Sequence, residues 1–175
     1  YNPLMQAIKD HPHPVITALN GPAAGVGCSL ALVGDIVVCA QSAYFLQAFR
    51  RIGLVPDGGS TWLLARTIGR VRAMEMALFG DKVPAEKALE WGMVNRIVED
   101  DQLMPTALEM AEKLATGPTI ALSLARELIW KACESDFDEA IYDERIAQRT
   151  AGRTDDFKEG VTAFLKKRPA EFKGK

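Results

Sequence analysis

Histidine is scarce in this chain of 175 residues, and its two copies, His11 and His13, stand before the first predicted strand. A histidine-based metal site needs several clustered ligands, and a Ser-His-Asp triad needs one well-placed imidazole. The sequence therefore excludes most triad hydrolases and offers no metal ligand set. We expect both histidines to be surface residues of a loop.

Cysteine is also scarce, and long apolar runs are lacking. Cys28, Cys39 and Cys133 are odd in number, widely spaced and set among apolar residues. This pattern favours buried free thiols over disulfides or a zinc site, and free thiols indicate a reducing compartment. No apolar run reaches the ~18 residues of a membrane span. These absences predict a protein of the cytoplasm or of an organelle matrix, with the cytoplasm preferred, and no membrane partner.

Charge of one sign is not in excess, because 21 Lys and Arg face 23 Asp and Glu and the net charge is −2. No basic stripe carries interleaved aromatic residues, which argues against a nucleic-acid partner. The two dense basic spots are Arg50-Arg51 and residues 166–168. Each is either a solvated surface or a contact for a small anionic ligand.

Short β-rich runs alternate with helical patterns as far as Gly117-Pro118, and only helical patterns follow. Predicted strands cover 14–20, 35–40, 43–46 and 94–98, and predicted helices cover 27–33, 59–68, 71–79, 84–91, 119–133, 137–151 and 155–168. The helix at 84–91 is expected to begin with proline at its first position. This order predicts an α/β core over 1–117 and a helical region over 118–175 of the same domain, which packs on the core or on another subunit.

A glycine-rich turn, residues 21–29, links the first predicted strand to a helix. Its backbone N–H groups can approach an anion or a developing oxyanion. A dinucleotide fingerprint fails because position 30 is Leu, a Walker A loop fails because no Gly-Lys-Ser/Thr occurs, and a nucleophile elbow would need a later histidine. An oxyanion site and simple close packing of the turn against the sheet both remain open.

One carboxylate, Asp57, stands among apolar residues in the stretch GLVPDGGSTW at 53–62. Burial disfavours the charged form of a carboxylate, so we expect a buried Asp57 to be a stronger base than an exposed aspartate. The alternative is that Asp57 or Ser60 only caps the following helix. A backbone donor site together with a lone buried acid would be the minimum parts for enolate chemistry.

Ten short motifs spread over the chain share one resemblance. They are PVI at 14–16, NGPAAGVGC at 20–28, LA at 30–31, DI at 35–36, GLVP at 53–56, GST at 59–61, GR at 69–70, GD at 80–81, GMV at 92–94 and DFKEGVTAFLKKR at 156–168. Together they resemble the crotonase (enoyl-CoA hydratase/isomerase) superfamily. The resemblance implies a crotonase-like spiral of ββα units, acyl-CoA thioesters as substrates, no cofactor beyond the CoA of the substrate, and a homotrimer or dimer of trimers.

The resemblance also assigns residues. The Val26 N–H corresponds to one donor of the family's oxyanion hole, with Gly25 and Gly27 shaping its turn. Phe164 and Lys167 match positions that contact CoA, often across a subunit boundary. The second oxyanion donor and most of the CoA-nucleotide pocket are expected upstream of this chain, which resembles a family member without its first third.

Two departures from the hydratase pattern decide between branches of the family. Hydratases place glutamates where Ser29 and Phe49 stand, whereas this chain has an acid at Asp57, as the isomerase branches do. The resemblance is nearest to the branch that isomerises ring epoxides in phenylacetyl-CoA degradation. The dehalogenase branch also uses an aspartate here but pairs it with tryptophan at position 49, so it fits less well.

These observations predict an acyl-CoA isomerase. We expect the thioester oxygen to bind the Val26 N–H and Asp57 to take and return the proton. Phe49 and Trp62 are expected to line the acyl pocket, whereas core packing explains Leu54 better. The alternatives are an enoyl-CoA hydratase and an inactive fragment that only binds acyl-CoA or assembles.

Overall fold

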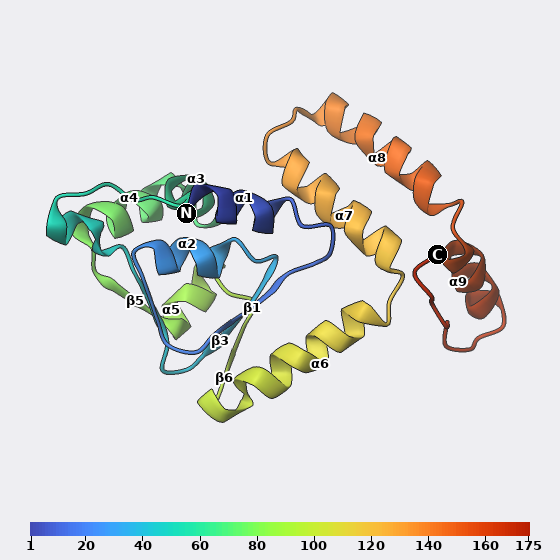
Figure 1. Cartoon of the computed structure of the whole chain (residues 1–175), viewed down its shortest axis with the longest axis horizontal. Coiled ribbons are helices and arrows are strands. Elements are labelled where there is room, and N and C mark those ends of the chain that lie inside the picture. Colours follow the sequence, from blue (N-terminus) through green and yellow to red (C-terminus); the bar gives the residue numbers. More distant parts are fainter. The chain divides into compact units, whose positions relative to one another are not determined.

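The computed structural model describes all 175 residues, which form two compact units. Unit 1 contains residues 1–11 and 15–109, and unit 2 contains residues 12–14 and 110–175. Strands and helices alternate along unit 1, whereas the orange and red part of the chain in unit 2 is helical (Figure 1). None of the helices combines the length and the apolar character needed to cross a membrane.

Two three-stranded sheets form the frame of unit 1. The first is parallel with the order β1-β3-β6, and its strands are β1 (Ile16–Leu19), β3 (Ile36–Ala40) and β6 (Arg96–Val98). The second has the order β2-β4-β5, and its strands are β2 (Pro22–Ala24), β4 (Tyr44–Leu46) and β5 (Lys82–Pro84). Strand β4 is parallel to β2 and antiparallel to β5. The central strands β3 and β4 are largely buried, as their continuous apolar sequences predict.

Helices connect the strands of unit 1. Their bounds are α1 (Asn2–Lys9), α2 (Val26–Leu32), α3 (Ser60–Thr67), α4 (Gly69–Phe79) and α5 (Ala85–Glu90), with short 3-10 helices η1 (Ala48–Ile52) and η2 (Asp100–Gln102). Helix α2 follows β2 directly and is mostly buried, as its small and apolar residues predict. Pro84 is the N-cap residue of α5 and not its first helical residue as predicted, because Pro84 is also the last residue of β5.

Three long helices follow α6 (Leu103–Ala115), the helix within which the two units divide. They are α7 (Thr119–Ala132), α8 (Phe137–Ala151) and α9 (Asp155–Leu165). Helix α8 begins where the Asp136 side chain accepts the Glu139 N–H, and α9 begins where the Thr154 hydroxyl accepts the Phe157 N–H. The predicted boundary at Gly117-Pro118 falls between α6 and α7, inside unit 2.

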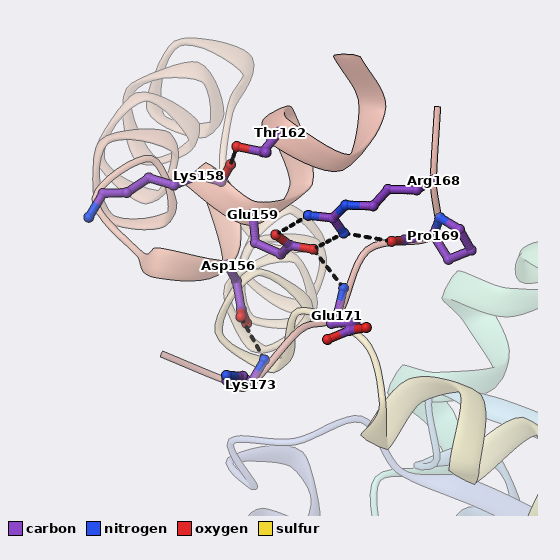
Figure 2. A network of polar contacts seen from close by, with 8 residues as sticks. All are labelled: Asp156, Lys158, Glu159, Thr162, Arg168, Pro169, Glu171 and Lys173. Atoms are coloured by element: carbon purple, nitrogen blue, oxygen red, sulfur yellow. Dashed lines mark hydrogen bonds and ion pairs between the residues drawn. The ribbon is translucent and has the colours of Figure 1, made fainter. Parts of the chain in front are cut away.

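The chain reverses after α9, and residues 168–175, here called the tail, return along that helix (Figure 2). The Glu159 carboxylate accepts two hydrogen bonds from Arg168, at 2.6 and 2.9 Å, and one from the Glu171 N–H at 2.9 Å. The Asp156 carboxylate accepts the N–H groups of Lys173 and Gly174 at 2.7 and 2.9 Å. We call the two carboxylates and their tail partners the tail clamp.

Two expectations about scarce residues have different outcomes. Cys28 and Cys39 are buried free thiols as predicted, but Cys133 is exposed, so the prediction of burial is wrong there. Its apolar neighbours lie on α7 and its end, where Ile129 is also exposed. His11 and His13 are exposed in the loop before β1, as predicted.

The tail clamp predicts a dependence on acid. Hydrogen bonds from Arg168 and then from the Glu171 N–H lower the pKa of Glu159 from 4.5 to about 2. Because the folded pKa is the lower one, this carboxylate stabilises the docked tail fully above the unfolded-state pKa, and the contribution disappears as the pH falls toward 2. In a carbon NMR titration of the Glu159 carboxyl, we expect a midpoint near 2 in the natural protein and a clearly higher midpoint in Arg168→Gln, where the Glu171 N–H still lowers the pKa but the Arg168 hydrogen bonds are lost. A natural-protein midpoint near 4.5 would contradict the clamp.

Candidate active site

The turn between β2 and α2 presents a backbone donor. Gly25 has φ +56° and precedes α2, and its N–H donates to the Leu46 carbonyl at the end of β4 at 2.9 Å. Val26 is the first residue of α2, and the first amides of a helix have no acceptor within that helix. The Phe49 ring lies 3.5 Å from the position of a Cβ at Gly25. Phe49 therefore covers this turn, and a side chain at position 25 would fit beside the ring but would be strained by the positive φ.

Two other residues of this segment, Gly27 and Cys28, differ from Gly25 in their surroundings. The Cys28 thiol is fully buried and donates to the Ala23 carbonyl at 2.8 Å, and burial raises its pKa to about 11. A thiol in this state ties α2 to β2 and is not a nucleophile. No heavy atom lies within 4 Å of a Cβ position at Gly27. Gly25 has a positive φ that favours glycine and Gly27 does not, and the role of both in shaping an oxyanion turn stays a prediction.

The Asp57 turn packs directly on the first turn of α2. At Gly58, with φ +59°, a Cβ would lie 3.1 Å from both Val26 Cγ2 and Ser29 Cβ. The fully buried Ser29 hydroxyl donates to the Asp57 carbonyl oxygen at 2.9 Å, and the Ser60 N–H donates to the same oxygen at 3.0 Å. These contacts bring the predicted acid's turn against the helix that begins with the predicted donor.

A second buried contact fixes the far side of the Asp57 turn. The Gln47 amide donates from Nε2 to the Ser60 hydroxyl at 2.6 Å, and both side chains are almost completely buried. The Gln47 Oε1 atom is buried without a hydrogen-bond partner. Gly59, with φ +81°, caps α3, and no side chain does so. The alternative that Asp57 or Ser60 serves as the side-chain cap of this helix is therefore wrong.

The Asp57 side chain is exposed, and the expectation that it is a buried acid is wrong for this chain. The turn directs the main-chain carbonyl toward Ser29, so that the inner face is backbone. Its apolar neighbours share this exposure, with Leu54 60% and Val55 79% accessible. The prediction that Leu54 packs in the core is therefore also wrong, because its side chain is exposed. Desolvation of Asp57 would have to come from a bound substrate or from a further protein surface.

The two aromatic residues predicted for the acyl pocket are both partly buried. Phe49 lies on η1 against Gly25, and Trp62 lies on α3 with the Arg66 guanidinium 4.1 Å from its ring centre. The cation covers one face of the indole and leaves the rest of the ring for other contacts. A role of Phe49 and Trp62 in lining an acyl pocket stays a prediction.

Phe164 and Lys167, the predicted CoA contacts, belong to unit 2. Phe164 is 82% exposed near the end of α9, and Lys167 is exposed at the chain reversal that follows. Sequence reasoning did not find the contacts of Gln47 with Ser60 or of Gly58 with α2. The one sequence signal for this turn is the Gly58-Gly59 pair, which is typical of a sharp bend but does not identify the segment that packs on it.

Comparison with known proteins assigns the family. The model of the enoyl-CoA hydratase/isomerase family matches residues 1–175. The 1,2-epoxyphenylacetyl-CoA isomerase of Escherichia coli strain K12 is 50% identical over 100% of this chain and 67% of its own length. The probable enoyl-CoA hydratase of Rhodobacter capsulatus is 44% identical over 100% of this chain and 68% of its own length. The solved structure of enoyl-CoA hydratase from Bacillus anthracis matches with a TM-score of 0.96 and 34% identity, over 99% of this chain and 67% of that one.

The chain therefore belongs to the enoyl-CoA hydratase/isomerase family. Its α/β fold is the crotonase fold that the sequence motifs predicted. It spans about two thirds of the length of these relatives.

Gly58 and Gly59 offer a matched pair of substitutions. Both have positive φ, but only Gly58 has neighbours within 4 Å of a Cβ position. Gly59→Ala should lower the free energy of unfolding by ~1–2 kcal/mol through backbone strain alone. Gly58→Ala should cost a further ~1–3 kcal/mol, because the methyl group meets Val26 and Ser29. Equal losses in urea unfolding would show that the Asp57 turn is not packed tightly on α2.

Proposed function

We propose that this chain isomerises an acyl-CoA thioester, with Asp57 as general acid and base and the Val26 N–H as an oxyanion donor. The observation that carries the proposal is the buried hydrogen bond from Ser29 to the Asp57 carbonyl oxygen, at 2.9 Å. It holds the turn of the acid against α2 through main-chain atoms and leaves the carboxylate side chain exposed to a substrate. An exposed carboxylate on a rigid turn can reach a carbon next to a bound carbonyl.

In the proposed reaction the thioester oxygen accepts a hydrogen bond from the Val26 N–H. Asp57 removes a proton from the carbon next to the carbonyl, and the negative charge moves to the thioester oxygen as an enolate. The oxyanion contact is strongest in this enolate, which lowers the barrier to its formation. The same carboxyl group then returns the proton at another carbon. Asp57 can serve both steps, and the chemistry needs no group beyond the CoA of the substrate.

The substrate class is an acyl-CoA, with Phe164 and Lys167 as its CoA contacts. The name of the Escherichia coli relative supports a ring-epoxide acyl-CoA as the particular substrate. We also propose a homotrimer or dimer of trimers, in which the exposed apolar residues near the end of α9, such as Leu165, are covered by another subunit.

A hydratase is the second candidate, favoured by the name of the Rhodobacter capsulatus relative. Two features speak against it. A larger side chain at the fully buried Ser29 would meet the Gly58 turn, since their contact is already tight. The apolar Phe49 covers the Gly25 turn where a second carboxylate would be needed to hold water. The acid at Asp57 is therefore the better candidate for proton transfer.

The first functional test replaces the proposed base. In the full-length protein, Asp57→Asn should lower kcat for isomerisation of 1,2-epoxyphenylacetyl-CoA or of a 3-enoyl-CoA by at least ~100-fold, since the substitution removes general acid–base catalysis. The exposed Asp101→Asn on η2 is the matched control and should retain the natural rate. Near-normal turnover in Asp57→Asn would remove Asp57 from the mechanism. No turnover by the natural protein would favour an inactive binding or assembly role.

The second test compares reactions. Hydration of crotonyl-CoA by the full-length protein, followed by loss of the enoyl absorbance, should be at least ~100-fold slower than isomerisation, because Ser29 and Phe49 supply no second carboxylate. Comparable rates of water addition and isomerisation would favour the hydratase candidate instead.

A further inference from the structure

The chain reversal at the end of α9 holds Lys167 in an unusual conformation. Lys167 has φ +51° and is the one non-glycine residue with positive φ in the chain. Its N–H donates to the Phe164 carbonyl at 3.2 Å, and the Arg168 N–H donates to the Ala163 carbonyl at 3.1 Å. The left-handed conformation is strained for a lysine, so the contacts around it must offset that strain.

Arg168 supplies the first of these contacts. Its guanidinium makes a bidentate pair with the Glu159 carboxylate and also donates to the Pro169 carbonyl at 2.9 Å (Figure 2). A single surface ion pair contributes little, but a two-point fork to one carboxylate fixes geometry as well as charge. Glu159 also accepts the Glu171 N–H, so the same carboxylate holds both ends of the turn that follows Lys167.

The rest of the tail is fixed to the start of α9 and of α7. The Asp156 carboxylate, only 4% exposed, is satisfied by the N–H groups of Lys173 and Gly174. Gly174 has φ +68°, and a Cβ there would lie 2.6 Å from the Thr119 hydroxyl, so the close approach requires glycine. The tail therefore lacks regular secondary structure yet is anchored at both of its ends.

We propose that the tail clamp positions Lys167 to bind the phosphate groups of CoA, with Glu159 and Arg168 as positioning residues. This inference rests on the proposed function, which makes Lys167 a CoA contact. The Arg168 guanidinium is engaged by Glu159, whereas Lys167, the preceding residue in the chain, is exposed. The clamp thus neutralises one cation and fixes the backbone from which the next cation extends toward an anion.

The sign of one charge change separates positioning from simple electrostatics. Glu159→Gln removes a negative charge close to a proposed phosphate site, and Coulomb attraction alone would then make an anionic ligand bind more tightly. Positioning predicts the opposite result, because loss of the clamp lets Lys167 leave its strained conformation. The matched control for the cation is Lys158→Gln, since Lys158 is an exposed residue of α9 paired only with Asp155 at 2.8 Å.

The experiment measures CoA affinity by calorimetry in the full-length natural protein and in four variants. Glu159→Gln and Arg168→Gln should weaken CoA binding about fivefold or more, equivalent to ~1 kcal/mol. Lys158→Gln, which loses the same charge as Arg168→Gln, should change affinity by less than about twofold, as exposed pairs usually do. Arg168→Lys keeps the charge without the bidentate fork and should fall between these results. If Glu159→Gln or Arg168→Gln fails to fold, the CoA affinity of Arg168→Lys still tests the positioning role of the clamp.

A second measurement limits the effect to the phosphate groups. With acyl-pantetheine substrates, which lack the CoA nucleotide, kcat and KM of the clamp variants should equal those of the natural protein. Unchanged or tighter CoA binding by Glu159→Gln would overturn the inference, as would equal losses in Lys158→Gln and Arg168→Gln. Failure of the natural protein itself to bind CoA would instead overturn the proposed function on which the inference rests.

Discussion

The hydrogen bond between the Ser29 hydroxyl and the Asp57 carbonyl oxygen joins the two segments on which the candidate site depends. One segment is the β2–α2 turn with its backbone donor, and the other is the glycine turn that carries the acid. The bond is fully buried at its serine end, so losing the donor would leave the Asp57 carbonyl with the Ser60 N–H alone. In the intact structure the main-chain carbonyl of Asp57 is directed toward Ser29, and the side chain of the acid is exposed.

The sequence predicted the order of elements well where each element is long or continuously apolar. Helices α3, α7 and α8 and strands β1, β3 and β4 lie within or close to the predicted ranges. Strands β2 and β5 were missed because their sequences, Pro-Ala-Ala and Lys-Val-Pro, have few of the β-branched and aromatic residues that favour strands, whereas the equally short β4 is Tyr-Phe-Leu. Helix α6 was missed although its pattern is amphipathic. It ends just before Gly117-Pro118, where we predicted the boundary between the core and the helical region.

The candidate site was less predictable than the fold. Motifs identified the candidate residues, but they could not show whether the Asp57 side chain is buried, because that depends on residues distant in sequence. One of these, Ser29, binds the Asp57 main-chain carbonyl, and the side chain is exposed. The contact between Gly58 and α2 spans about thirty residues of chain and has no local signature. Similarly, acidic residues such as Asp156 and Glu159 are common near the start of a helix, so the sequence gives no sign that they bind the tail. Their hydrogen-bond partners appear only in the folded structure.

The close approach of Gly58 to Ser29 also constrains how the sequence of this protein can diverge. Position 58 must remain glycine on two separate grounds: its φ is positive, and an added Cβ would lie only 3.1 Å from Val26 and Ser29. A lineage that acquired a larger side chain at position 29 would have to move the 57–59 turn in the same step, because either change alone meets a filled space. Variation in chemistry among relatives should therefore accumulate at the half-buried positions Phe49 and Trp62 in preference to positions 29 and 58.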